Sequence, residues 1–157
     1  MKKYLSVLLL FCTVAACRLD LQAQAVPKNA NERLVLDFYN LAFNAHKPAE
    51  AAQRYIGATY IQHNPLVPNG SAPFVNYFAA FFQTHPTAAL DMVRVISEGD
   101  LVVVHSKFTT GPQDRGQAII DIFRVADGKI VEHWDVIQPI PEQSANGNTM
   151  FAGNNAH

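Results

Sequence analysis

Cysteine is scarce in this chain of 157 residues: there are two, Cys12 and Cys17, and both stand near the N-terminus. The rest of the chain therefore has no disulfide, no thiol nucleophile and no cysteine-based zinc site. Runs of basic residues are also missing, since 12 Lys and Arg face 13 Asp and Glu and the net charge is −1. With no basic patch to contact phosphates, we expect no nucleic-acid partner.

The chain also lacks the short motifs of several enzyme classes. It has no glycine-rich phosphate loop, no G-x-S-x-G and no H-E-x-x-H spacing, so nucleotide use, serine hydrolysis and a zinc-protease site have no support. Five residues offer metal-ligand types, but they are scattered through the sequence: His63, His105, Asp121, His133 and Asp135. Because no ligand spacing connects them, we predict no metal and no cofactor.

No hydrophobic run of the sequence is long enough to span a membrane comfortably. Lys2 and Lys3 precede a short apolar stretch, residues 4–16. A positive start before a short apolar segment is typical of a signal peptide, so residues 1–25 are predicted to be a targeting segment. We expect an exported bacterial protein that is periplasmic, a lipoprotein of the outer surface, or secreted.

Two processing routes for this segment remain open. Residues 14–17, Val-Ala-Ala-Cys, resemble a bacterial lipobox, in which Cys17 would carry a lipid, attach the chain to a membrane and become the first mature residue. Residues 23–25, Ala-Gln-Ala, fit an ordinary cleavage site for secretion instead.

Residues 26–142 are predicted to form one domain that begins with helices. Apolar residues recur at helical spacing from Asn31, a potential cap, to about residue 46. Pro48 suits the first position of a second helix that runs to residue 55, and Ser71 can cap a third helix that runs to about residue 84. Residues 59–70 hold two prolines and an Asn-Gly pair, so we predict a loop without a regular element there.

Strands follow the helices, and the sequence predicts four of them, at residues 89–98, 101–110, 117–125 and 130–138. Short connectors, such as the turn dipeptide Asp127-Gly128, indicate an antiparallel meander. Helices followed by antiparallel strands predict an α+β fold, in which a curved sheet wraps the helices and leaves a cavity at its open end. Gly116 would help the sheet to curve. The tail, residues 143–157, is predicted to be flexible or ordered by a partner.

The last predicted strand carries ionisable groups on both of its faces. Because strand side chains alternate, His133 and Asp135 share one face, whereas Glu132 and Trp134 share the other with Ile130. An Asp beside a His in an apolar cavity is a workable acid/base pair. Alternatively, the pair orients the strand or contributes to a subunit contact.

Three further polar residues are candidates for the same cavity. Asp121 lies in an apolar run, where a charge is costly without a partner, so it is either a second carboxyl of the pocket or the partner of Lys107 or a nearby histidine. His63 would donate to a substrate carbonyl or fix the turn-rich loop, and Asn64 is expected to fix that loop. His105 either faces Asp121 in the cavity or is a hydrogen-bonded core histidine.

Three stretches, YIQHNP, EGDLVVVHS and above all DIFRVADGKIVEHWD, resemble the SnoaL-like polyketide cyclases. That family belongs to the nuclear transport factor 2-like superfamily of cone-shaped α+β barrels. The resemblance covers about residues 31–142 and implies N-terminal helices on a curved antiparallel sheet, a cavity between them and a homodimer. It also implies that a carboxylate of the last strand, Asp135 by motif position, acts as acid and base in an intramolecular aldol condensation. The cyclases have a histidine on the preceding strand where this chain has Asp121.

The residues and the resemblance together support one leading hypothesis and two alternatives. The leading one is an exported SnoaL-like enzyme that moves protons on a small apolar carbonyl compound, by aldol-type cyclisation or isomerisation. The candidate catalytic residues are Asp135, His133, Asp121, His63 and His105. The first alternative is a non-catalytic domain that binds a hydrophobic small molecule. The second is a structural dimer with a vestigial cavity.

Overall fold

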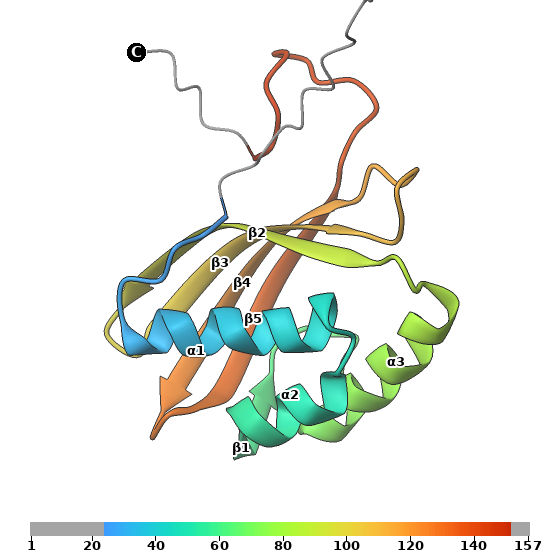
Figure 1. The fold of residues 1–157 in the computed structure, drawn as a ribbon. Coiled ribbons are helices and arrows are strands. Elements are labelled where there is room, and N and C mark those ends of the chain that lie inside the picture. Colours follow the sequence, from blue (N-terminus) through green and yellow to red (C-terminus); the bar gives the residue numbers. More distant parts are fainter. Residues whose placement is uncertain (1–23, 152–157) are drawn as a thin grey trace, which may run out of the picture.

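The computed structural model describes residues 24–151. The cysteines, the lipobox and nearly all of the predicted targeting segment lie outside these residues, as do residues 152–157. Helices cover one face of a single curved sheet, and α1 crosses the strands (Figure 1). The helices are α1 (Ala30–Tyr39), the π-helix η1 (Asn40–Asn44), α2 (Pro48–Tyr55) and α3 (Ser71–Thr84). The strands are β1 (Ile56–Gln62), β2 (Ala89–Glu98), β3 (Leu101–Thr109), β4 (Gln117–Ala126) and β5 (Lys129–Pro139).

The first helix begins two residues earlier than the sequence predicts. Asn29, not Asn31, caps α1, because its extended backbone lets the side chain accept a hydrogen bond from the Glu32 backbone N–H at 2.9 Å. The Glu32 carboxylate is buried and accepts in turn from the Ser97 hydroxyl, which ties the start of α1 to β2. The helical region then passes into η1 instead of continuing as one α-helix to residue 46. The predicted second and third helices are confirmed, but Ser71 is the first residue of α3 and not its cap, since Gly70 holds the cap position without a side chain.

The sheet has one strand more than predicted. The four C-terminal strands lie where the sequence places them and form the antiparallel meander β2-β3-β4-β5. Residues 56–62, however, form β1, which lies at the sheet edge and pairs in parallel with β5. The prediction of a loop over residues 59–70 was therefore wrong for residues 59–62 and right for residues 63–70, and the sheet is mixed instead of antiparallel. The prolines that suggested a loop follow the strand, at positions 65 and 68.

A bulge in β5 changes one face assignment. Arg124 pairs with Glu132, but Val125 pairs with Ile130, so Val131 is an extra residue in β5. Ile130 is consequently fully buried in the core and lies on the same side of the sheet as His133, not with Glu132 as predicted. We call this side, which faces the helices, the inner face, and the opposite side the outer face.

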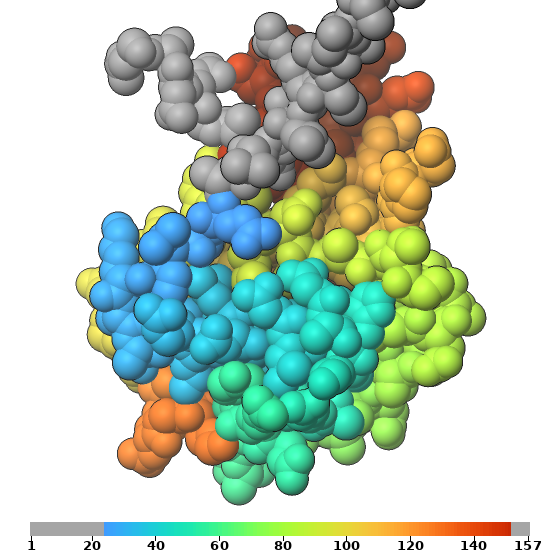
Figure 2. Space-filling view, viewed as in Figure 1, coloured from blue at the N-terminus to red at the C-terminus, as the bar shows by residue number. Residues whose placement is uncertain are grey.

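The core fills the space between the helices and the inner face. Its largest fully buried side chains include Phe38 of α1 and Phe123 of β4, whose rings meet edge to face at 6.2 Å. In the space-filling view the helices cover the inner face almost completely (Figure 2). Within residues 24–151, no helix combines the length and the apolar character needed to cross a membrane.

Part of the predicted flexible tail packs on the sheet. Phe151 is buried, and its ring stacks on His105 with centroids 5.4 Å apart. The Phe151 carbonyl also accepts a hydrogen bond from Arg94.

Candidate functional site

A cavity of about 510 Å³ lies between α1, α3 and the inner face. Its wall is mainly aromatic and includes Phe38, Phe43, Phe74, Phe78, Phe81 and Phe108. A fourth phenylalanine of α3, Phe82, is buried in the core and does not line the cavity. Polar side chains converge on the sheet side of the cavity, from the middle of β4 and β5 and from the end of β1 with the loop that follows it. An apolar pocket of this size with a few convergent polar groups is typical of a small-molecule site.

Two carboxylates face this cavity from adjacent strands. Asp121 on β4 pairs directly with Asp135 on β5, so both side chains lie on the inner face. Asp121 is only 3% exposed, whereas Asp135 is half-buried. Burial raises the pKa of Asp121 and the charge of Asp135 adds to this effect, while the hydrogen bond from His133 opposes it. The Oδ2 atom of Asp121 has no hydrogen-bond partner among residues 24–151.

His133 connects Asp121 to the end of β1. Its Nε2 lies 3.1 Å from Asp121 Oδ1, and its Nδ1 lies 2.9 Å from Gln62 Oε1. Gln62 Oε1 also accepts from the Asn64 backbone N–H at 3.0 Å, which identifies this atom as the amide oxygen. Nδ1 of His133 must therefore carry a proton. A second proton lies between Nε2 and Asp121, because two unprotonated acceptors would repel each other at this distance.

Asp135 is held by Asn64, a residue that the sequence assigned only to fixing the loop. Asn64 Nδ2 donates to both carboxylate oxygens of Asp135, each at 2.9 Å. Asn64 Oδ1 accepts from the Leu66 backbone N–H at 2.9 Å, so the orientation of the amide is fixed. Asn64 thus fixes the loop and also orients the carboxylate.

Two buried tyrosines complete the polar side of the cavity. Burial, followed by the charge of Asp121, raises the pKa of both Tyr39 and Tyr60, so their hydroxyls remain O–H donors at physiological pH. Sequence reasoning missed both. A signal was present for Tyr60, because Tyr60, Gln62 and Asn64 alternate in the sequence as residues of one strand face do. Tyr39 lies on an apolar helix face and gives no such signal.

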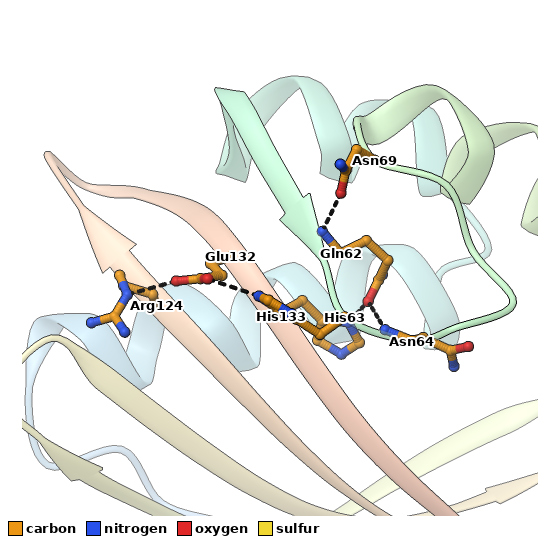
Figure 3. A network of polar contacts seen from close by, with 7 residues as sticks. All are labelled: Gln62, His63, Asn64, Asn69, Arg124, Glu132 and His133. Carbon is orange, nitrogen blue, oxygen red and sulfur yellow. Dashed lines mark hydrogen bonds and ion pairs between the residues drawn. The ribbon is translucent and has the colours of Figure 1, made fainter.

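His63 does not line the cavity, although the sequence placed it at the cavity mouth. It projects to the outer face, between the inward-pointing Gln62 and Asn64 (Figure 3). Its ring stacks on Trp134 with centroids 4.6 Å apart and an interplanar angle of 1°. Its Nε2 lies 2.8 Å from Glu132 Oε1.

His105 also lies on the outer face. The neighbour that faces Asp121 across β3 and β4 is Val104, so the alternation of side chains directs His105 outward. Its Nδ1 lies 2.6 Å from Arg94, whose charge, together with desolvation as the larger cause, lowers the pKa of His105. Of the five predicted site residues, the cavity therefore brings together Asp121, His133 and Asp135.

These three residues are also the ones that could hold a cation. One ligand atom from each lies within 4.8 Å of the others, and two carboxylates with one imidazole suit several divalent metals. Their polar atoms already have partners, however: His133 Nε2 binds Asp121, and Asp135 binds Asn64. A cation at this point would have to replace the proton between His133 and Asp121.

The sequence profile of the SnoaL-like domain matches residues 35–133, well over half of the chain. The chain belongs to the SnoaL-like family. Asp135 lies two residues beyond the matched segment. Among curated proteins, no sequence matches the chain.

Solved structures confirm the nuclear transport factor 2-like fold of this SnoaL-like chain. TsrD from Streptomyces laurentii is 21% identical with a TM-score of 0.58, over 71% of this chain and 90% of TsrD. A protein from Bacillus cereus ATCC 10987, proposed to be a polyketide cyclase, is 21% identical with a TM-score of 0.60, over 74% and 89% of the two chains. A nuclear transport factor 2-like protein from Cytophaga hutchinsonii ATCC 33406 is 17% identical with a TM-score of 0.57, over 76% and 96%. At these identities the likeness establishes the fold alone.

Proposed function

We propose that this SnoaL-like chain is an exported acid/base enzyme that acts on a small, largely apolar carbonyl compound, by aldol-type cyclisation or isomerisation. The observation that carries the proposal is the pair of carboxyls at one side of an aromatic cavity. Asp135 is oriented as a hydrogen-bond acceptor by Asn64, while the pKa of the deeper Asp121 is raised by burial. Two neighbouring carboxyls whose environments differ in this way can divide the roles of base and acid.

Asp135 is the base in this proposal, because it is the less buried of the two carboxylates and faces the cavity. One of its oxygens removes a proton from the carbon next to the substrate carbonyl. The electron pair of the broken C–H bond forms a C=C bond, and the carbonyl oxygen becomes an enolate oxygen. That enolate either takes a proton at another carbon, which is isomerisation, or attacks a second carbonyl of the same molecule, which is aldol cyclisation. A positioned base typically contributes about 10²–10⁴-fold to the rate.

The developing negative charge on the substrate oxygen needs a donor nearby. The hydroxyls of Tyr39 and Tyr60 line the cavity and keep their protons, and the Asp121–His133 pair holds one more. These groups take the role of donor to the substrate carbonyl that the sequence analysis gave to His63. The largely apolar wall lowers the polarity around these groups, which strengthens each of these interactions.

A second function, non-catalytic binding of a hydrophobic molecule, is favoured by one specific observation. The His133 and Asp135 side chains are already hydrogen-bonded within the described chain, and most of the remaining cavity wall is aromatic or aliphatic. A binding module needs such a wall and no free base.

The Asp135→Asn variant tests the enzymatic proposal. The measurement is incorporation of solvent deuterium next to the carbonyl of a panel of cyclic and aromatic ketones. We expect the variant to lose exchange by about 100-fold or more while keeping its circular dichroism spectrum, because it loses the base and keeps the shape. Asp91→Asn, which changes an exposed aspartate of β2, is the matched control and should exchange as the wild type does.

Unchanged exchange in Asp135→Asn would remove Asp135 as the base. If the wild type exchanges no ketone of the panel, and a fluorescent apolar dye binds equally to wild type, Asp135→Asn and His133→Ala, the binding function replaces the enzymatic one.

Export remains part of the proposal on the basis of Lys2, Lys3 and the short apolar stretch after them. The mass of the mature chain from a bacterial host distinguishes lipidation at Cys17 from cleavage after Ala25. A full-length mass would contradict both routes.

A further inference from the structure

A chain of polar contacts crosses the outer face, and Figure 3 shows its part from Arg124 through Glu132 to His63. Asp100 binds Arg124 at 2.7 Å, Arg124 binds Glu132 at 2.8 Å, and Glu132 binds His63 at 2.8 Å. Arg124 also lies over Trp134, with its guanidinium carbon 5.7 Å from the ring centroid. We call these five residues the outer clamp. None of them lines the cavity.

The outer clamp ends at a segment outside the β4–β5 hairpin that holds two of the candidate catalytic groups, His133 and Asp135. His63 stands between Gln62 and Asn64, and the side chains of these two neighbours hold His133 and Asp135. The His63 backbone N–H also donates to the His133 carbonyl at 2.9 Å. Because neighbouring side chains point to opposite sides of an extended segment, the rotation that directs His63 outward directs both amides inward.

Besides the pairing of β1 with β5, in which Gln62 lies opposite His133, few contacts within residues 24–151 hold this segment in place. The loop that follows β1 is closed at its base, where Asn69 accepts from the Gln62 backbone N–H at 2.9 Å and the Gly70 N–H donates to Tyr60 at 2.9 Å. Leu66, near its tip, is 89% exposed. Between base and tip, the segment meets the sheet through the two inward amides, the His63 backbone and the His63 ring.

We infer that His63 is a positioning residue, which holds residues 62–64 in the rotation that lets Gln62 and Asn64 orient His133 and Asp135. The His63 ring on the outer face thus affects the cavity through the backbone that it shares with Gln62 and Asn64. Glu132 strengthens this effect, since the hydrogen bonds from Arg124 first and His63 second lower the pKa of this carboxyl and keep it an anion that accepts from both side chains. The inference concerns the site of the proposed function, but its test needs no turnover.

The test is a comparison of nuclear magnetic resonance signals in the mature chain. In His63→Ala, we expect hydrogen exchange of the Asn64 side-chain amide and of His133 Nδ1–H to become about tenfold faster, because the segment opens more often. The carboxyl-carbon signal of Asp135 should also move, because Asn64 would hold that carboxylate less firmly. The variant His63→Gln keeps a donor toward Glu132 and should restore part of the protection.

His105→Ala is the matched control. It removes a histidine from the same face that also stacks on an aromatic ring, but it makes no contact with residues 62–64. We expect the cavity signals of His105→Ala to match the wild type. The inference is overturned if His63→Ala leaves these signals unchanged, or if His105→Ala shifts them equally, because the effect would then be general loss of stability.

The two proposals fail separately. Altered cavity signals in His63→Ala, together with no ketone exchange by the wild type, would support the positioning role and remove the enzymatic function. Unaltered cavity signals in His63→Ala, together with a loss of ketone exchange in Asp135→Asn, would remove the positioning role and support the enzymatic function.

Discussion

Asp121 is a carboxyl group that is almost completely buried, so a negative charge on it is costly in the folded chain. Its pKa is raised in the folded chain, so between the ordinary aspartate pKa of about 3.9 and the raised value, the folded state binds more protons than the unfolded state. The free energy of unfolding is therefore highest below the ordinary aspartate pKa, and it falls as the pH rises from that value through the raised pKa of Asp121. Asn at this position has no charge to desolvate.

At the residue scale we predict that Asp121→Asn gains stability relative to the wild type as the pH rises from about 4 to 7. Each unit of pKa difference corresponds to about 1.4 kcal/mol in the free energy of unfolding. Urea unfolding at several pH values measures the gain, and the exposed Asp91→Asn should show no such trend. A difference that stays constant with pH would contradict the raised pKa.

The sequence identified Asp121, His133 and Asp135 because two physical rules suffice for them. One is the cost of a carboxylate in an apolar run, and the other is the alternation of side chains along a strand. His63 and His105 were misplaced because sequence alone does not decide which face of a strand lies inside. Tyr39 was missed because a tyrosine on an apolar helix face does not indicate which partner its hydroxyl approaches.

At the scale of elements, Gly116 decides whether β3 and β4 can meet at the cavity end of their hairpin. Its φ is +86°, and an added Cβ would lie 2.3 Å from the Phe108 carbonyl oxygen and 2.8 Å from Thr109 Cγ2. Phe108 forms part of the cavity wall. The residue that the sequence suggested for curvature thus allows a close approach of two strands.

We predict that Gly116→Ala lowers the free energy of unfolding by about 2–4 kcal/mol, because the backbone strain and the clash act together. Gly99→Ala is the control: its φ is +60°, but no atom lies within 4 Å of the added Cβ. It should cost only about 1 kcal/mol. Equal losses in the two variants, measured by urea unfolding, would show that the close approach to Phe108 costs nothing.

Element prediction succeeded where partners are neighbours in the sequence and failed where they are distant. The strands of the β2–β5 meander are joined by short turns, and their periodicity is local. The pairing of β1 with β5 joins Gln62 to His133, and nothing in residues 56–62 indicates that partner. The bulge at Val131 was missed for a related reason, since it is a property of two paired strands and not of one.

At the scale of the whole molecule, the outer face carries exposed apolar side chains for which the described chain provides no cover. Ile96 is 62% exposed, Ile120 39% and Val136 70%. Three such residues on one sheet face fit the homodimer that the family resemblance implies, and we propose this face as the subunit contact.

We therefore predict that the wild type is a dimer by light scattering and that Val136→Glu shifts it to a monomer, because a buried unpaired carboxylate is costly. Val26→Glu is the control, since Val26 is 76% exposed and precedes the helices instead of lying on the sheet. A wild type that is monomeric at all concentrations, or a dimer that tolerates the glutamate, would exclude this face.

The parallel pairing of β1 with β5 also has a consequence for the order of folding. The hydrogen bonds that join Gln62 to His133 and Asn64 to Asp135 each close a separation of 71 residues. Pairs this distant form slowly, whereas hairpins form on the microsecond scale, so we expect the β2–β5 meander to be in place first. An early folding chain would already have its three ionisable groups on one surface. It would acquire the two amides that orient these groups only when its N-terminal half docks. The site would therefore be able to act only in chains that have finished folding.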